Sequence, residues 1–235
     1  MNIKPLLIVL FVFSFSLTNA QEFGIGLKGG VNYNYIGDFK SVGSNSSLGS
    51  FSADNEIGYQ FGVFVDIGFD RFFVRPEANY VSLKNSYAFP TKVSNWASQQ
   101  IDIPILFGYK IYYPVAIYAG PVFSFISDMT MEGMKDSSYS EPFTYNTSSA
   151  GISAGILLDF DRVGIDFRYK YGITTVKEQR IVMIKNYNGY GVDIGDLLEY
   201  NPSQIMVNIQ VKLFTVNSGE RYRRSKSDWR NHKNL

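Results

Sequence analysis

Charged side chains recur at alternate positions in several segments of this 235-residue chain, as at Arg75 and Glu77. Residues two apart on an extended strand point to the same face of a sheet, so such charges would share one side. Opposite charges gathered on one face can form a structural network of ion pairs or a path for protons or ions. The residues of this predicted charge network are Lys28, Asp66, Arg75, Glu77, Asp102, Asp166, Arg168 and Lys170.

Residue types that support catalysis or metal binding are scarce. The chain has no Cys, which excludes a disulfide framework, a thiolate metal site and a cysteine nucleophile. Its single histidine, His232, stands near the C-terminus, which weakens the case for a histidine base or a multi-histidine metal site. Asp193, Asp196 and Glu199 could bind a hard cation, but their spacing does not match an EF-hand loop. We therefore expect no catalytic site, no cofactor and no bound metal.

The overall charge gives no reason to expect a nucleic-acid partner. The chain holds 22 Lys and Arg against 21 Asp and Glu, so its formal net charge is only +1. Aromatic residues make up 16% of the chain and charged residues only 18%. This mixture suits a soluble core, and it also suits a wall whose outer face meets lipid.

Apolar residues alternate with small or polar ones along eight segments. In the first, Ile25 and Leu27 lie on one parity, and Gly26 and Lys28 lie on the other. Most segments have about the 9 to 11 residues that a tilted strand needs to cross a bilayer. The expected strands span residues 23–35, 57–69, 72–80, 101–109, 115–125, 150–160, 163–171 and 205–213.

The connections between these segments alternate between short and long. Short turns are expected at residues 70–71, 110–114 and 161–162. Long polar loops are expected at residues 37–56, 81–100, 126–149 and 172–204. This asymmetry is typical of outer-membrane barrels. We predict an all-β fold, an eight-stranded antiparallel up-and-down transmembrane β-barrel with short periplasmic turns and long extracellular loops.

A soluble barrel that binds an apolar ligand has the same strand count and is the alternative fold. It would turn its apolar parity inward, whereas here the second parity carries too many charges for an apolar cavity. Aromatic residues also gather at both ends of the strands, for example Phe72 and Phe160 at one end and Tyr33 and Tyr171 at the other. Two such belts are typical of membrane interfaces.

The two ends of the chain differ from the predicted barrel at residues 21–214. Residues 1–20 combine Lys4, an apolar run and a small residue before Gln21, which predicts a cleavable secretory signal; the alternative is a membrane anchor. Residues 215–235 form a basic tail, predicted to be disordered and periplasmic. We expect it to be simply solvated or to contact an anionic cell-wall polymer, lipid headgroups or an acidic protein. The contact residues would be Arg221, Tyr222, Arg223, Arg224, Lys226, Trp229 and Arg230.

An eight-stranded barrel has an interior only wide enough for side chains to fill. A symmetric register at the 70–71 turn places Asp66 opposite Arg75, and Glu77 is expected to meet Arg168 or Lys28. We therefore favour a plugged lumen with a structural charge network, and a small pore is the alternative. The inward bulk is predicted to come from Phe64, Leu106, Tyr118, Leu157 and Met206.

Two loops have informative compositions. The stretch Ser41–Ser52 is rich in Ser, Gly and Asn, which predicts flexibility. The third loop holds Met129, Met131 and Met134 near Tyr139, Phe143 and Tyr145. Methionines among aromatic residues can bind a partner or can pack the loop locally across the barrel mouth.

Five segments resemble one known family when they are taken in order. They are FFVRPEANYVSLK from Phe72, IDIPILFGYKI, YAGPVFSF, GIDFRYKYGITTV and IMVNIQVKLF. The set is similar to the PorT-like outer-membrane β-barrel domain family, over about residues 21–214. This resemblance implies a location in the outer membrane of a Gram-negative envelope, and it implies lipid as a neighbour. It implies no specific activity, although the name-giving member of the family is associated with a machine that secretes proteins across the outer membrane, which raises a role as an accessory of an envelope or protein-secretion assembly. The residues themselves lead us to expect a structural or interaction role, with other envelope proteins as partners through the loops.

Overall fold

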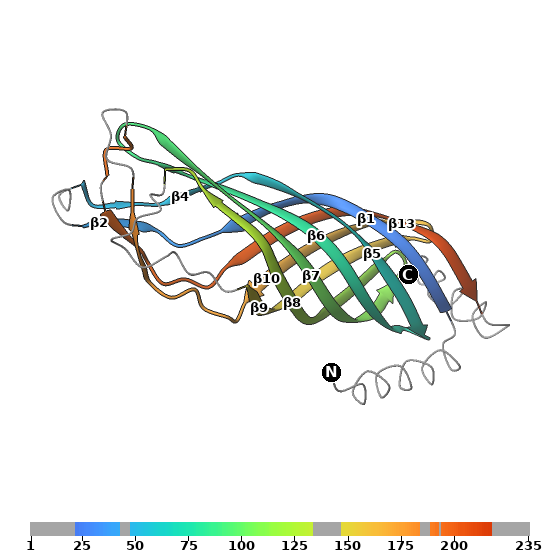
Figure 1. Ribbon diagram of the computed structural model, residues 1–235. Helices are drawn as coiled ribbons and strands as arrows, with labels where there is room; N and C mark the ends of the chain where they lie inside the picture. The colour runs from blue at the N-terminus through green and yellow to red at the C-terminus, as the bar shows by residue number, and fades with distance from the viewer. Residues whose placement is uncertain (1–21, 43–47, 134–146, 184–188, 193, 218–235) are drawn as a thin grey trace, which may run out of the picture.

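Eight long strands form a ring in the computed structural model, which describes residues 22–42, 48–133, 147–183, 189–192 and 194–217 (Figure 1). They are β1 (Glu22–Tyr35), β5 (Ile57–Phe69), β6 (Phe72–Ala88), β7 (Val93–Tyr112), β8 (Val115–Met131), β9 (Ser148–Phe160), β10 (Val163–Gly172) and β13 (Ser203–Asn217). The ring order is β6-β5-β1-β13-β10-β9-β8-β7, and β7 pairs in turn with β6. Each of these strands is antiparallel to both neighbours, which confirms the predicted eight-stranded, all-β fold.

The alternation of residue types separates an outer face from an inner face. On β1, Leu27 is 48% exposed and Val31 is 50% exposed, whereas Lys28 between them is 5% exposed. Because successive strand residues point to opposite faces, the charged parity turns into the ring and the apolar parity turns outward. The outward apolar surface includes aromatic residues from both predicted belts, such as Phe72 at 63% and Tyr171 at 45% exposure.

Three short turns close one end of the ring, which we call the turn end. Two of them are Asp-Arg pairs, at residues 70–71 and 161–162. Asp70 has a φ of 57° and Asp161 a φ of 70°, a left-handed conformation that Asp tolerates better than most residues. The third turn holds residues 113–114, because β7 continues to Tyr112, two residues beyond the predicted start of the turn at Lys110.

The opposite end, which we call the loop end, holds more strand than the sequence predicts. The long loop expected at residues 81–100 is wrong, because β6 continues to Ala88 and β7 begins at Val93. β8 likewise continues to Met131, inside the loop expected at residues 126–149. Backbone pairing between antiparallel strands does not require apolar side chains on the outer face. Polar residues such as Gln99 therefore continue the pairing of β7 with β8 beyond the segments whose outward residues are apolar.

A second, smaller sheet lies at the loop end and has the order β11-β12-β2-β3 (Figure 1). It combines β2 (Phe39–Val42) and β3 (Ser50–Phe51) with β11 (Gln179–Val182) and β12 (Ile194–Leu197), while β4 (Ala53–Asn55) pairs with β6. The flexibility predicted for Ser41–Ser52 is therefore wrong for the residues in β2 and β3, and residues 43–47 lie outside the described ranges.

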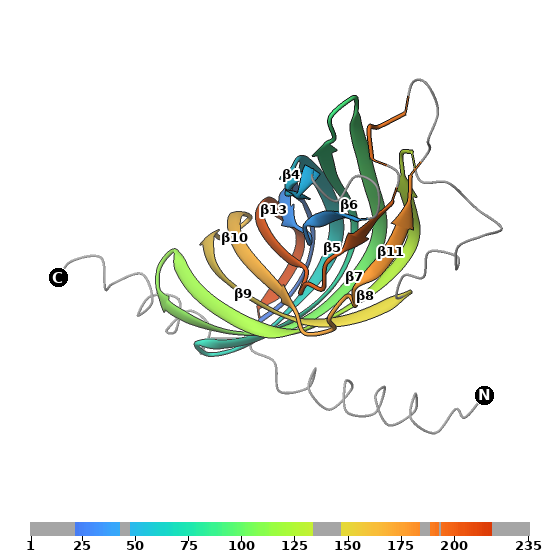
Figure 2. The same cartoon turned by 90° about the vertical axis from the view of Figure 1, so that its left-hand side faces the viewer.

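An apolar core joins this small sheet to the extended ends of β6 and β7. Phe39 and Tyr87 are fully buried, and the rings of Tyr87 and Trp96 lie 4.6 Å apart. We call the small sheet together with this core the cap, and Figure 2 views the molecule with its loop end toward the reader. The cap core consists of Phe39, Tyr87, Phe89, Trp96, Ile181, Met183, Tyr190, Val192 and Leu197.

Met131 packs against the cap core, as the local-packing alternative for the third loop predicts. Met129 is half-buried, while Met134, Tyr139, Phe143 and Tyr145 lie outside the described residues. Residues 1–21 and 218–235, with the predicted signal and most of the basic tail, lie outside them too. β13 continues to Asn217, so residues 215–217, which we assigned to the tail, are part of the barrel. Within the described ranges, no helix is long and apolar enough to cross a membrane.

The hydrogen-bond ladders of three adjacent strand pairs are interrupted at one level of the wall. The pairing of β5 with β6 skips two residue pairs beside Pro76, that of β6 with β7 skips two beside Pro104, and that of β7 with β8 skips two beside Pro121. The register is the same on both sides of each gap. Since proline has no N–H to donate, each interruption follows from the sequence.

Candidate functional site

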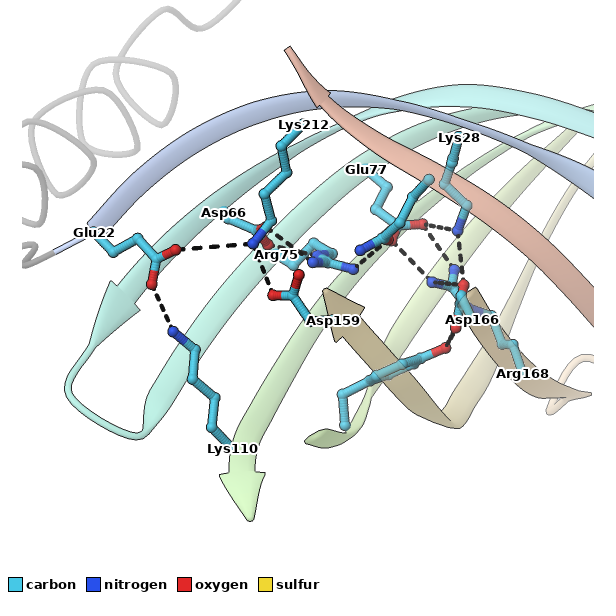
Figure 3. Close-up of polar contacts among 12 residues, drawn as sticks. Glu22, Lys28, Asp66, Arg75, Glu77, Lys110, Asp159, Asp166, Arg168 and Lys212 are labelled. Carbon is cyan, nitrogen blue, oxygen red and sulfur yellow. Dashed lines mark hydrogen bonds and ion pairs between the residues drawn. The ribbon is translucent and has the colours of Figure 1, made fainter. Parts of the chain in front are cut away.

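The predicted charge network lies inside the ring, and its central layer joins four strands (Figure 3). Glu77 on β6 accepts hydrogen bonds from Lys28 Nζ on β1 at 2.9 Å and from Arg168 Nη1 on β10 at 2.8 Å. Asp166, also on β10, lies 3.2 Å from Lys28 Nζ and 3.0 Å from Arg168 Nη2. The sequence predicts that Glu77 contacts either Arg168 or Lys28, and in the structure Glu77 contacts both.

Tyr118 on β8 completes this layer. Its hydroxyl donates to Asp166 and accepts from Arg168 Nε at 2.9 Å. β6, β1, β10 and β8 are every second strand of the ring. Inward side chains of alternate strands lie at one level in a barrel, so four strands suffice to fill the cross-section here.

A second layer lies nearer the turn end. Arg75 donates to Asp66 through Nε at 2.5 Å and through Nη2 at 2.9 Å, which confirms the predicted pair. Lys212 Nζ lies 2.8 Å from Asp159 and 3.6 Å from Asp66. At the rim, Lys110 Nζ donates to Glu22 at 2.6 Å.

Sequence reasoning missed four members of this second layer: Glu22, Lys110, Asp159 and Lys212. A signal for three of them was present. Asp159 has the inward parity of Leu157, Lys212 has that of Met206, and Glu22 continues the parity of Lys28. Asp159 and Lys212 lie inside the strands predicted at residues 150–160 and 205–213, and Glu22 lies one residue before the strand predicted at residues 23–35, so the alternation of residue types assigns all three to the interior.

A third layer lies toward the loop end. Lys170 Nζ donates to Asp102 at 2.6 Å and to Ser124 Oγ at 2.7 Å. Gln100 Nε2 adds a bond of 2.8 Å to Asp102. All eight residues of the predicted network therefore lie inside the ring and have partners there.

The lumen charges balance one for one. The three layers hold six carboxylates and six cations, and every carboxylate has a cationic nitrogen within 3.0 Å. Burying a charge is tolerated only when it is paired, and a paired interior has little net field. The carboxylates are Glu22, Asp66, Glu77, Asp102, Asp159 and Asp166, and the cations are Lys28, Arg75, Lys110, Arg168, Lys170 and Lys212.

Bulky inward side chains fill the space between these layers. The five residues predicted to close the lumen are all buried, with Phe64 and Leu106 at 0% exposure. Large residues face glycines on the neighbouring strand: Phe64 pairs with Gly26, and a β-carbon at Gly26 would lie 2.3 Å from the Phe64 ring. The cavity beside Arg75 and Lys212 measures only about 10 Å³, close to the space of one water molecule.

The acidic residues proposed for a hard cation do not form a site in the described part of the chain. Asp196 accepts hydrogen bonds from Arg180 at 2.8 and 3.1 Å in the cap. Asp193 lies outside the described residues. Over the ranges that the structure describes, no group of three or more His, Asp or Glu side chains could hold a metal ion.

A ring of eight antiparallel strands with an apolar outer face and a paired polar interior defines a transmembrane β-barrel of the outer-membrane kind. The model of the outer membrane protein beta-barrel domain family matches residues 19–178, and the chain belongs to this family. The protein is accordingly located in the outer membrane.

Solved structures of other outer-membrane proteins are similar in overall arrangement. Neisserial surface protein A (NspA) is 16% identical, with 82% of this chain and 99% of that chain covered and a TM-score of 0.45. Ail, the attachment invasion locus protein of Yersinia pestis, is 11% identical, with 82% and 99% covered and a TM-score of 0.40. AlkL is 9% identical, with 84% and 93% covered and a TM-score of 0.44. No curated protein matches the chain.

Proposed function

We propose that this protein is a non-catalytic, non-conducting outer-membrane barrel with a structural or interaction role. The observation that carries the proposal is the lumen, where six carboxylates and six cations are paired between bulky side chains. A conducting pore needs a continuous water-filled path, and side-chain packing of this kind leaves no room for one.

The cap supports the interaction role. Its buried aromatic core holds segments that are distant in the sequence in one fixed arrangement. For example, Phe39 of β2 packs against Tyr87 of β6, and their ring centroids are 6.1 Å apart. A folded surface loses less entropy on binding than a flexible loop does. We place the cap on the extracellular side, and we propose that it contacts other envelope proteins.

The sequence supports a narrower family membership and a periplasmic contact. The order of the five PorT-like segments supports membership of the PorT-like group and a role as accessory of an envelope or protein-secretion assembly. The basic tail supports a contact with an anionic component of the periplasm, because it carries six Lys or Arg against two acids. Deletion of the residues after Ser218 would then reduce co-purification with envelope components; unchanged co-purification would remove the tail from the proposal.

Conductance in planar lipid bilayers tests the plugged lumen against the alternative, a small pore. Purified protein should give no steady, reproducible channel steps under conditions in which a water-filled porin does. Regular steps with the wild-type chain would overturn the proposal. The chain has no Cys, so single cysteines placed at exposed positions of the loop end, such as Lys40 in the cap and Lys84 on β6, would allow crosslinking of cap partners in intact envelopes.

A further inference from the structure

The outer face of the barrel has a hollow of about 390 Å³ over β5 and β6. Its walls are the outward side chains of Leu27, Phe61, Val63, Ala78, Tyr80 and Ile101. Its floor is the wall at Lys28, Gly62 and Asn79. The Lys28 ammonium and the Asn79 amide donate to Glu77 in the lumen, so the surface that the hollow presents to the outside is almost entirely apolar. The volume falls within the ~300 to 1,000 Å³ of pockets that hold small ligands.

The hollow arises because a small residue stands among large ones. Ala78 pairs with Val63 on β5, and the next outward row holds Phe61, Tyr80 and Ile101. The Tyr80 ring rests on that of Phe61 at a centroid distance of 5.0 Å, within its own row. Ala78 also lies in the interrupted stretch of the β6–β7 ladder, which skips the residue pairs between Pro76 and Asn79.

We propose that this hollow binds one acyl chain of a membrane lipid, whose head group lies toward the loop end. The hollow opens on the lipid-facing surface of an outer-membrane barrel, so a lipid chain is the apolar group that reaches it. The Tyr59 and Tyr80 rings, 6.3 Å apart, stand at its loop-end side. Tyrosines at that position suit the level of lipid head groups, which orients the chain.

Photo-crosslinking tests this site. The full chain is reconstituted in phosphatidylethanolamine vesicles with a trace of phosphatidylethanolamine that carries a diazirine in its acyl chain, and the adducts are mapped by peptide mass spectrometry. Adducts on Phe61, Val63 and Tyr80 should exceed those on outward residues of β9 and β10 by about fourfold, the factor for burial of one extra methylene. Ala78→Leu should remove this excess because it fills the hollow.

A matched control is Ala154→Leu, which adds the same side chain at an exposed, outward alanine on β9 outside the hollow. It should leave the excess unchanged. Val63→Ala widens the hollow and should raise the excess, so it provides a second reading if Ala78→Leu fails to fold. Adducts spread evenly around the barrel, or an excess that survives Ala78→Leu in folded protein, would overturn the proposal.

Discussion

Arg168 binds Glu77 through both of its terminal nitrogens, at 2.8 and 2.9 Å, across the full width of the barrel. Arg168 lies on β10 and Glu77 on β6, which are opposite each other in the ring of eight strands. The planar guanidinium fits a carboxylate in this two-bond geometry. The pair therefore ties two walls that have no backbone hydrogen bonds between them.

Loss of Arg168 should destabilise the barrel strongly. In Arg168→Met, Lys28 would be the one cation left beside both Glu77 and Asp166, so one buried negative charge would be uncompensated. We expect this to lower the free energy of unfolding by about 3 to 5 kcal/mol. Urea unfolding in lipid vesicles, followed by circular dichroism, measures this cost. The double variant Arg168→Met/Glu77→Leu removes one charge of each sign and should lose less than the single variant. The exposed cap pair offers a control, since Arg180→Met should cost no more than about 1 kcal/mol.

The close contact of Phe64 with Gly26 should allow mutual rescue. Gly26→Ala places a β-carbon 2.3 Å from the ring and should destabilise the barrel by about 1 to 3 kcal/mol through overpacking. Combination with Phe64→Leu should recover part of that loss, because the smaller side chain vacates the space. The same unfolding measurement on the two single variants and the double variant gives the coupling. Strict additivity would show that the ring does not occupy the space beside Gly26.

Replacement of Pro121 by a residue with a backbone N–H should stabilise the pairing of β7 with β8. Pro121 lies on the outer face of β8, opposite Ile105 by the register on both sides of the gap. Pro121→Val supplies an N–H for the missing bond, which we expect to add about 1 kcal/mol to the free energy of unfolding. Phe123→Val, an outward change on the same strand where the ladder is intact, supplies no new donor and should not stabilise. An equal response of both variants would mean that the prolines do not weaken the ladder.

The cap should open without unfolding of the barrel. Trp96 packs on Tyr87 in the cap core, far from the charge layers, and Trp96→Ala should cost the cap about 3 to 5 kcal/mol. Limited proteolysis should then cut the loop end of the variant while the membrane-embedded strands stay protected. Protection of the loop end equal to that of the wild type would contradict an independent cap core.

Acid should weaken the contact of Glu132 with Lys92 and Asn95 beside the cap. Glu132 accepts hydrogen bonds from Lys92 at 2.7 Å and from Asn95 at 2.8 Å, and the Lys92 bond is the main cause that lowers the pKa of Glu132 from 4.5 to about 2. A lowered folded-state pKa gives stabilisation that is present above pH 4.5 and is lost as the pH falls toward 2. Protease sensitivity of the loop end should rise over that interval. The rise should weaken at high salt, since both partners are exposed, and Glu132→Gln should abolish it.

The sequence by itself determined which face of each strand meets lipid. Alternation with period two depends only on local residue types, so the eight strands, the short turns and the inward charges of Lys28, Arg75 and Arg168 were predictable. The pair Asp66–Arg75 was predictable as well, because a two-residue turn fixes the register of the hairpin around it.

Only the tertiary structure decided which charges meet across the lumen and that the loop end is folded. Glu77 meets Arg168 over 91 residues of sequence because ring closure sets strand order and stagger, which no local pattern encodes. The cap escaped prediction for the same reason. Its core takes single apolar residues from distant segments, such as Phe39, Trp96 and Leu197, and each has too few apolar neighbours in its own segment to form a periodic pattern.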